Sequence, residues 1–339
     1  MKAIAHFKCL PIEHPDALVE IDIPEPVPGP RDLLVEVKAV SVNPVDTKVR
    51  QGYVPHEDES QPRILGWDAA GVVKSVGSDV TLFKPGDRVW YAGSLIRPGS
   101  NSELQLVDER IVGSMPQSLD FSQAAALPLT SLTAWELLFD RLGVARDTTD
   151  RGETLLIIGA AGGVGSILTQ LARQLTGLTI IGTASRPETQ TWVTELGAHH
   201  VIDHTKPLSE ELKRIGIAQV SHVASLTQTD RHYEQIIESL KPQGKLGLID
   251  DPATLDAVPL KRKSLSLHWE LMYTRSLYET EDMQEQHNIL NEIARRIDAG
   301  DLRTTVGENY GRISAENLRR AHALLESGKA KGKIVLEGF

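Results

Sequence analysis

The spacing of hydrophobic and polar residues differs between two parts of the chain. Residues 1–125 carry short Val- and Ile-rich runs interrupted by proline and glycine, a pattern typical of an irregular β barrel. Within this part, Leu33–Val40 alternates between apolar and polar side chains, as a half-buried strand does. From residue 126 onward, helix-like and strand-like segments alternate, which predicts a doubly wound parallel sheet. We therefore expect an α/β protein with a β-rich domain at 1–125 and a second domain at 126–268.

The second domain contains a clear strand-to-helix transition. The apolar run Leu155–Ile158 is typical of a buried parallel strand, and the glycine-rich segment Gly159–Gly165 follows it directly. Apolar residues then recur at helical spacing from Val164 to Leu175, which predicts a helix packed on the sheet. We expect further strands at 179–184, 200–202, 219–224 and 245–250, and further helices at 187–196, 208–214 and 230–240.

The glycine spacing after the first of these strands predicts a phosphate-binding turn. Small residues at Gly159, Gly162 and Gly165 let the backbone approach a ligand, and the following helix directs free N–H groups and its positive dipole end toward an anion. A strand precedes the glycines and an amphipathic helix follows them, which is the context of a dinucleotide-binding fingerprint. The predicted cofactor-binding residues of this turn are Gly159, Gly162, Gly163, Val164 and Gly165.

The end of the second strand indicates which dinucleotide binds. An NAD-binding site usually has Asp or Glu there to bind the ribose hydroxyls, whereas this chain has Thr183-Ala-Ser-Arg186. Ser185 can donate a hydrogen bond, and the guanidinium of Arg186 can bind a 2′-phosphate through two N–H groups. We therefore predict NADPH as the cofactor. The alternative is that Arg186 is a solvated residue ahead of the helix-initiating Pro187.

The amino-acid composition limits the kinds of molecule that the protein is expected to bind. The 339 residues contain 36 Lys and Arg against 46 Asp and Glu, and the net charge of −10 disfavours nucleic acid and anionic lipid as partners. No apolar run approaches the length of a membrane span and the first residues lack a signal-peptide pattern, so we expect a cytoplasmic protein. The single cysteine, Cys9, excludes an internal disulfide and a multi-thiolate zinc site.

Several segments together carry a family resemblance. They are Val42–Lys48, Leu65–Val72, Lys84–Val89, Leu127–Ala134, Gly159–Gly165 and Gly328–Val335. Over essentially its full length the chain resembles the medium-chain dehydrogenase/reductase superfamily, and within it the zinc-free quinone oxidoreductase branch. The resemblance implies a GroES-like catalytic domain, a Rossmann domain and a C-terminal segment, 269–339, that returns to the catalytic domain. It also implies a homodimer formed through the edges of the Rossmann sheets, with Ser264–Trp269 as the candidate strand.

The resemblance also identifies the positions at which zinc-dependent relatives hold their catalytic metal. Those relatives use a Cys, a His and a second Cys, and the matching positions here are Asn43, Trp67 and Leu129. An amide is a poor zinc ligand, and indole and isobutyl groups are not ligands. The relatives' proton-relay hydroxyl falls on Val45. We therefore expect no metal site, even though zinc labels are common among similar proteins.

Site roles follow from the same matches. Asn43 is expected to face the nicotinamide and to donate a hydrogen bond to a carbonyl oxygen. Tyr53 is expected either to donate a hydrogen bond or a proton to the substrate or to be an amphipathic loop residue. Asp46 is expected to orient the Asn43 loop or to cap a helix, and Trp67 to form a wall of the pocket. The loop 54–63 is expected either to shape the pocket rim or to be solvated. The remaining cofactor contacts implied by the resemblance are Thr133 and His204.

These features predict an NADPH-dependent reductase. Zinc polarises an alcohol oxygen for oxidation, whereas reduction of an electron-poor quinone or enone needs mainly proximity, orientation and a hydrogen bond to the developing oxyanion. The alternatives are a 2-enoyl or alkenal reductase of the same superfamily, a zinc-type alcohol dehydrogenase, and an NADPH-binding sensor without efficient turnover. A short-chain dehydrogenase is excluded, because none of the six tyrosines is followed by Lys four residues later.

Overall fold

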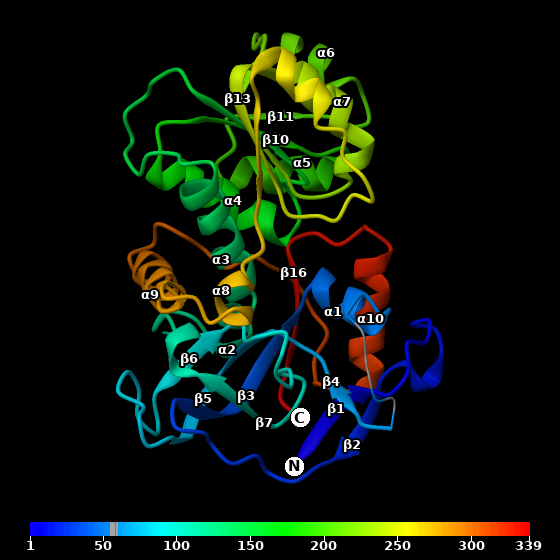
Figure 1. Ribbon diagram of the computed structural model, residues 1–339, viewed down its shortest axis with the longest axis vertical. Coiled ribbons are helices and arrows are strands. Elements are labelled where there is room, and N and C mark those ends of the chain that lie inside the picture. The colour runs from blue at the N-terminus through cyan, green and yellow to red at the C-terminus, as the bar shows by residue number, and fades with distance from the viewer. Residues whose placement is uncertain (55–57, 59) are drawn as a thin grey trace. The chain divides into compact units, whose positions relative to one another are not determined.

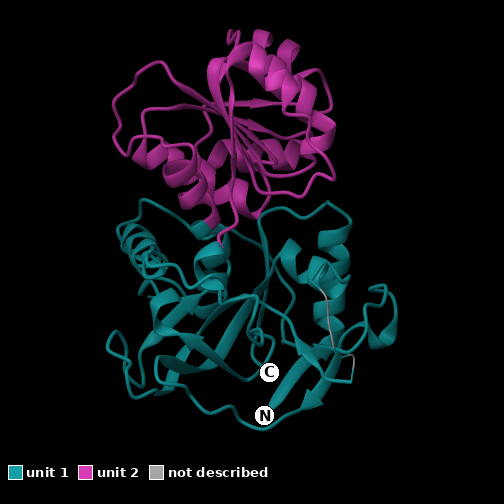
Figure 2. Ribbon diagram, viewed as in Figure 1, with its two compact units in different colours: residues 1–132, 273–339 teal, residues 133–272 magenta. Residues whose placement is uncertain are grey.

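The chain divides at two points into two units (Figure 2). The computed structural model describes residues 1–54, 58 and 60–339, so part of the loop 54–63 lies outside the described residues. Unit 1 comprises Met1–Leu132 and Tyr273–Phe339, and unit 2 comprises Thr133–Met272. The structure therefore places the two divisions a few residues later than the sequence predicts, and it joins the C-terminal segment to the N-terminal unit.

Unit 2 is built on a six-stranded parallel sheet in the order β11-β10-β9-β12-β13-β14. Its strands are β9 (Thr154–Ile158), β10 (Thr179–Thr183), β11 (His200–Ile202), β12 (Val220–Ser225), β13 (Leu240–Leu248) and β14 (Ser266–Trp269). The helices between them are α4 (Gly163–Leu175), α5 (Pro187–Glu195), α6 (Leu208–Arg214) and α7 (Thr229–Ser239). The predicted doubly wound sheet is confirmed.

Burial explains why these segments form strands and helices. Leu156, Val223 and Leu246 from three neighbouring strands are fully buried, as expected for apolar runs covered on both faces. Ile167 and Leu171 of α4 are also fully buried, which accounts for the helical spacing in the sequence. Strand β13 begins five residues earlier than expected from the sequence, since Leu240 already pairs with Val220 across a local irregularity in the register.

Unit 1 contains two β-sheets. A three-stranded sheet has the order β2-β1-β4, and a seven-stranded sheet has β15-β16-β3-β5-β6-β8 with β7 paired to β3. The strands are β1 (Lys2–His6), β2 (Val19–Asp22), β3 (Asp32–Val42), β4 (Arg63–Ile64), β5 (Asp68–Val76), β6 (Arg88–Tyr91), β7 (Leu104–Asp108), β8 (Val112–Ser114), β15 (Val306–Asn309) and β16 (Lys333–Glu337). The helices are α1 (Pro44–Arg50), α2 (Phe121–Ala125), α8 (Thr274–Leu277), α9 (Glu285–Asp298) and α10 (Ala315–Glu326).

The last strand of the chain is an interior strand of the larger sheet, next to the edge strand β15. Strand β16 pairs antiparallel with β3, so that Ile334 lies opposite Val42 and Leu336 opposite Val40 (Figure 1). This pairing joins the end of the chain to the N-terminal part of unit 1. Helix α3 (Pro128–Trp135) carries the chain across the first division between the units. No helix in the described ranges is long and apolar enough to span a membrane.

The turn between β9 and α4 gives a test of backbone packing. In Gly165→Ala the added carbon would lie 2.4 Å from the carbonyl oxygen of Gly159 and 2.6 Å from Cα of Ala160. We expect this substitution to lower the free energy of unfolding by about 1–3 kcal/mol, because overpacking forces the backbone to move. Gly162→Ala is the matched control, since its added carbon lies 3.4 Å from the nearest atom, the same Gly159 oxygen. Equal destabilisation of both variants in chemical denaturation would contradict this account.

Candidate functional site

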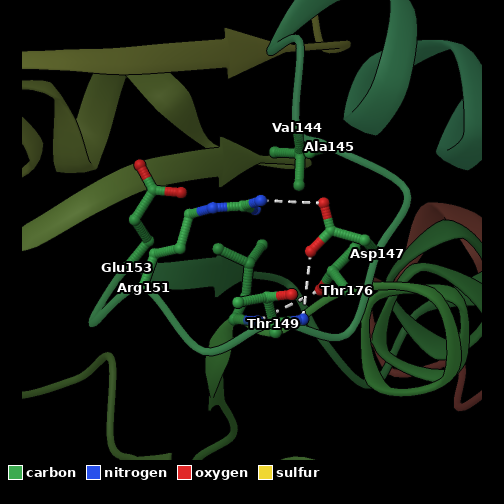
Figure 3. A pocket seen from close by; sticks show the side chains of 9 residues that line it. Val144, Ala145, Asp147, Thr149, Arg151, Glu153 and Thr176 are labelled. Atoms are coloured by element: carbon green, nitrogen blue, oxygen red, sulfur yellow. Dashed lines mark hydrogen bonds and ion pairs between the residues drawn. The ribbon is translucent and has the colours of Figure 1, made fainter.

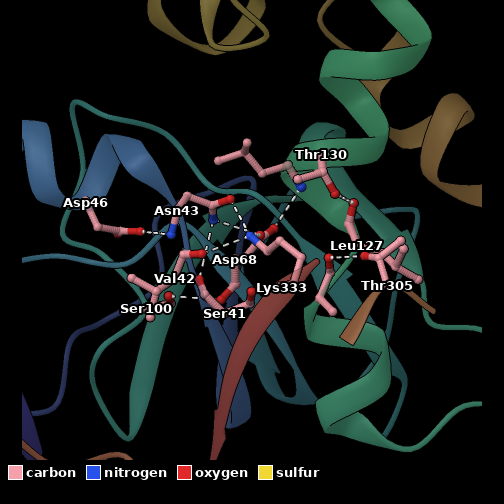
Figure 4. Close-up of polar contacts among 12 residues, drawn as sticks. Ser41, Val42, Asn43, Asp46, Asp68, Ser100, Leu127, Thr130, Thr305 and Lys333 are labelled. Atoms are coloured by element: carbon pink, nitrogen blue, oxygen red, sulfur yellow. Dashed lines mark hydrogen bonds and ion pairs between the residues drawn. The ribbon is translucent and has the colours of Figure 1, made fainter. Parts of the chain in front are cut away.

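A buried polar cluster lies in unit 1 where three strands of the larger sheet begin or end (Figure 4). Asn43 follows β3 and is the N-cap residue of α1, Asp68 is the first residue of β5, and Lys333 is the first residue of β16. Strand β3 pairs with both β5 and β16, and this pairing brings the three side chains together. We call these three residues the Asn-Asp-Lys cluster.

The ammonium group of Lys333 is fully hydrogen-bonded inside the protein. Its Nζ lies 3.0 Å from Oδ2 of Asp68 and 3.1 Å from the carbonyl oxygen of Val42, and it also donates to Oδ1 of Asn43. Only 3% of the residue is exposed. A buried charge is costly unless it is paired, and here three oxygen atoms match the three N–H donors.

The carboxylate of Asp68 links more segments than any other group of the cluster. Its Oδ2 accepts from Lys333 and, at 2.8 Å, from Nδ2 of Asn43, while Oδ1 accepts from the backbone N–H of Leu129 at 2.7 Å. Both ends of the Asn43 amide are therefore engaged within the protein. The structure brings Asn43 to the expected position after β3 but commits its amide to Asp68 and Lys333.

Asp46 lies in the first turn of α1. Its Oδ2 accepts from the backbone N–H of Asn43 at 2.5 Å, which is the helix-capping interaction considered from the sequence. Burial raises the pKa of Asp46 to about 7, opposed by the Asn43 hydrogen bond and the nearby charge of Lys333. Asp46 is thus a carboxyl group that is partly protonated near neutral pH.

The two predicted aromatic site residues lie in different surroundings. Trp67 is 1% exposed, and its indole N–H donates to the carbonyl oxygen of Ser94 at 3.1 Å. Tyr53 is 63% exposed just after α1, and its backbone N–H donates to the carbonyl oxygen of Lys48 at 2.9 Å. The polar group of Trp67 is therefore used in the interior of unit 1, whereas the ring of Tyr53 is largely open to solvent.

The residues at the family's zinc position do not fit zinc. The Asn43 amide is hydrogen-bonded on both sides, the Trp67 nitrogen carries a proton donated to Ser94, and Leu129 contributes only a backbone N–H. None of these groups is a thiolate or a free imidazole. In the part of the chain that the structure describes, no group of three or more His, Cys, Asp or Glu side chains is placed to hold a metal ion.

Two members of the cluster, Asp68 and Lys333, were not predicted as site residues from the sequence. Each is a charged residue next to a run of apolar strand residues. A charge in such a run is expected to be buried and therefore to need an opposite charge nearby, and this expectation could have identified the pair. Both are almost fully buried.

In unit 2 the glycine turn connects the end of β9 to the start of α4. Gly159 has φ +82°, a left-handed conformation suited to glycine, and its N–H donates to Oγ1 of Thr183 at 3.1 Å. Gly162 is the N-cap residue of α4, and the close approach of Gly165 to the turn leaves no room for a side chain. The first-turn N–H groups of α4 have no acceptor within a helix and suit an anion. They belong to Gly163, Val164 and Gly165.

The residues predicted to contact the adenosine part of the cofactor lie at one edge of this sheet. Because β10 and β11 pair in parallel, Ser185 and Arg186 after one strand and His204 after the other lie at neighbouring carboxyl ends. Nε of Arg186 lies 3.2 Å from Oε1 of Glu188, and both side chains are partly exposed. The ring of His204 packs edge-on against His232 with centroids 6.1 Å apart. The remaining predicted contact, Thr133, is buried on α3.

A hollow in unit 2 (Figure 3) is lined by residues other than those of the glycine turn. It is lined by residues 144–145, 147, 149, 151, 153 and 176–178, near the amino end of β9, whereas the turn follows the carboxyl end of that strand. Arg151 and Asp147 form an ion pair of 2.9 Å within it. Ligands of doubly wound sheets bind at the carboxyl ends of strands, so this hollow is not the dinucleotide site.

Comparison with known proteins agrees with this architecture. Residues 29–117 match the family model described as an alcohol dehydrogenase GroES-like domain, and residues 196–336 match the model described as a zinc-binding dehydrogenase. A crystal structure from Rhizobium etli CFN 42, provisionally described as a zinc-dependent alcohol dehydrogenase, has 54% sequence identity and a TM-score of 0.95 and covers 100% of this chain and 98% of that chain.

Two further relatives place the chain in its superfamily. The Escherichia coli quinone oxidoreductase complexed with NADPH has 29% identity and a TM-score of 0.84, and covers 99% of this chain and 100% of that chain. A zinc-type alcohol dehydrogenase-like protein of Staphylococcus aureus (strain MSSA476) is 41% identical over 340 residues, which cover 99% of each chain. The chain therefore belongs to the medium-chain dehydrogenase/reductase superfamily.

Proposed function

We propose that the protein is an NADPH-dependent reductase of quinones or other conjugated carbonyl compounds that works without zinc. The observation that carries this proposal lies at the family's metal position: the Asn43 amide is hydrogen-bonded to Asp68 and Lys333 of the Asn-Asp-Lys cluster, and Asn43, Trp67 and Leu129 supply no thiolate or imidazole ligand. The likeness to the E. coli quinone oxidoreductase complexed with NADPH supports the same acceptor class and cofactor.

The residues of each unit have separate tasks in this proposal. NADPH, when bound, supplies a hydride to an electron-poor carbon. In unit 2 the turn from Gly159 to Gly165 holds the pyrophosphate and Arg186 binds the 2′-phosphate. In unit 1 the Asn-Asp-Lys cluster forms a rigid, internally neutralised support, because the carboxylate of Asp68 and the ammonium of Lys333 balance each other. An electron-poor acceptor then needs orientation and a hydrogen bond to its oxygen rather than a Lewis acid.

The first prediction concerns turnover and metal. We expect purified protein to consume NADPH in the presence of 1,4-benzoquinone or a linear enone, measured by absorbance, with no change in rate after treatment with a chelator. Elemental analysis of protein purified without added metal is expected to find no stoichiometric zinc, because the donor set lacks thiolate and imidazole groups. One zinc per chain would overturn the zinc-free proposal, and NADPH binding without turnover of either acceptor would favour a sensor over a reductase.

The second prediction concerns the choice of cofactor. Arg186→Asp is expected to weaken NADPH binding by about tenfold to a hundredfold while changing NADH binding much less, because a carboxylate repels the 2′-phosphate that the guanidinium attracts. Dissociation constants for NADPH and for NADH, determined from cofactor fluorescence, measure the two effects. Glu188→Gln is the matched control: it removes the exposed carboxylate that pairs with Arg186 and is expected to leave NADPH binding unchanged or slightly stronger. Equal losses for both cofactors in Arg186→Asp would count against this role.

We also propose that the protein forms a homodimer through the edge strand β14. This strand ends the sheet order of unit 2, so its outer backbone groups can pair with a second copy, and Trp269 and Leu271 next to that edge are 52% and 51% exposed. The expected segment Ser264–Trp269 includes this strand.

The third prediction tests this edge. Trp269→Lys is expected to shift the protein from dimer to monomer in analytical ultracentrifugation, because a charge replaces a large apolar side chain at the contact. Tyr278→Lys serves as the control, since Tyr278 is a 77% exposed aromatic residue that lies in unit 1. A wild-type protein that sediments as a monomer at micromolar concentration would refute the dimer.

A further inference from the structure

The segment 226–228, which follows β12, packs against the glycine turn of unit 2. The backbone N–H of Leu226 donates to the carbonyl oxygen of Ile158, the last residue of β9, at 3.1 Å. A carbon added at Gly159 would lie 2.9 Å from Cγ2 of Thr227. The segment therefore lies directly against the first residue of the turn that is predicted to hold the pyrophosphate.

The order of the strands places this segment at the predicted cofactor site. Strand β9 lies between β10 and β12, and the chain continues from β9 to β10 and β11 before it returns to β12 on the other side. The strand order thus reverses at the carboxyl ends of β9 and β12, and doubly wound sheets bind their ligands at such a point. Segment 226–228 and the glycine turn are the two connections that leave this point.

Gln228 ends the segment in an unfavourable backbone conformation. Its φ and ψ are 53° and 38°, in the left-handed region that residues other than glycine rarely occupy. Such a conformation persists only where the surrounding contacts hold it in place. The next residue, Thr229, is the first residue of α7 and is held by such contacts.

Asp250, two residues after β13, supplies the contacts that hold Thr229. Its Oδ2 accepts from the backbone N–H of Thr229 at 2.8 Å, and its Oδ1 accepts from the Thr229 hydroxyl. Since that hydroxyl gives its proton to the carboxylate, the hydroxyl of Ser225 donates to Oγ1 of Thr229 at 2.7 Å. Thr229 and Ser225 are fully buried. We call Ser225, Thr229 and Asp250 the Asp250 clamp, because they join the ends of β12 and β13 to the first turn of α7.

We propose that Asp250 is a positioning residue of the dinucleotide site: by holding Thr229 through two hydrogen bonds, it keeps segment 226–228 against the glycine turn in the form that binds the cofactor. This inference rests on the proposed binding of a nicotinamide dinucleotide. The carboxylate of Asp250 also neutralises the positive end of α7, which leaves the pyrophosphate to the N–H groups of α4.

Dissociation constants for NADPH and for NADH, determined from cofactor fluorescence, test the role of the clamp. Thr229→Val removes the hydroxyl from a side chain of nearly the same shape, and Asp250→Asn replaces one accepting oxygen with a donor group. We expect each variant to weaken the binding of both cofactors about tenfold, because only a fraction of the molecules then holds the segment in the binding form. The ratio of the two constants is expected to keep its wild-type value, because both cofactors share the turn on which the segment packs. Unchanged constants in both variants would overturn the proposal.

Two further variants separate positioning from a general loss of stability, with every constant measured where circular dichroism shows the variant to be folded. Thr229→Ser keeps the N–H and the hydroxyl that Asp250 holds, and it is expected to bind both cofactors within twofold of the wild type. Asp298→Asn is the matched control in unit 1, since Asp298 accepts from the backbone N–H of Ser118 at 2.9 Å and from its hydroxyl at 2.7 Å. A tenfold loss of cofactor binding in Asp298→Asn would refute a specific role for Asp250.

The same measurements separate this inference from the proposed function. Wild-type protein that binds NADH but not NADPH would refute the proposed cofactor, while weaker NADH binding in the two clamp variants would still support the role of Asp250. Failure of the wild type to bind either cofactor would refute both. If the wild type turns over, the clamp variants are expected to raise the KM for NADPH about tenfold and to leave the KM for the acceptor within twofold. A change in the acceptor KM alone would overturn the positioning role and leave the reductase in place.

Discussion

The ion pair between Asp68 and Lys333 is the constraint on which the predicted catalytic unit depends. Each charge lies in the protein interior, where it is tolerated only with its partner. The pair fixes the starting points of β5 and β16, orients the amide of Asn43 and anchors the backbone N–H of Leu129. A single charge-paired contact therefore joins the sheet, the start of α1 and the start of α3.

The ion pair between Asp68 and Lys333 also bears on the zinc-related names of similar proteins. Relatives described as zinc-type or zinc-dependent share the fold along their whole length. In this chain the positive charge next to Asn43 and Asp68 is an ammonium group on a covalently attached side chain. A tethered cation with all its donors used can position neighbouring groups, but it offers no open coordination position to a substrate.

Unit 2 could be predicted from the sequence in more detail than unit 1 because its signals are local. The apolar strand, the glycine turn and the helical spacing from Val164 to Leu175 all lie within a short stretch, and β9 and α4 formed where they were expected. Asp68 and Lys333 are separated by 265 positions, and only the antiparallel register of β3 with β5 and β16 brings them together. The Asn43 amide could be located from its motif, but its partners could not.

The place of β16 between β15 and β3 in the larger sheet has a consequence for the order of assembly. Unit 2 is continuous in the chain, whereas the larger sheet of unit 1 gains β16 only from residues 333–337. During synthesis, Asp68 therefore remains without its cation until nearly the whole chain has been made. A chain that ends before residue 333 leaves this buried carboxylate uncompensated, so synthesis of β16 is coupled to completion of the candidate site.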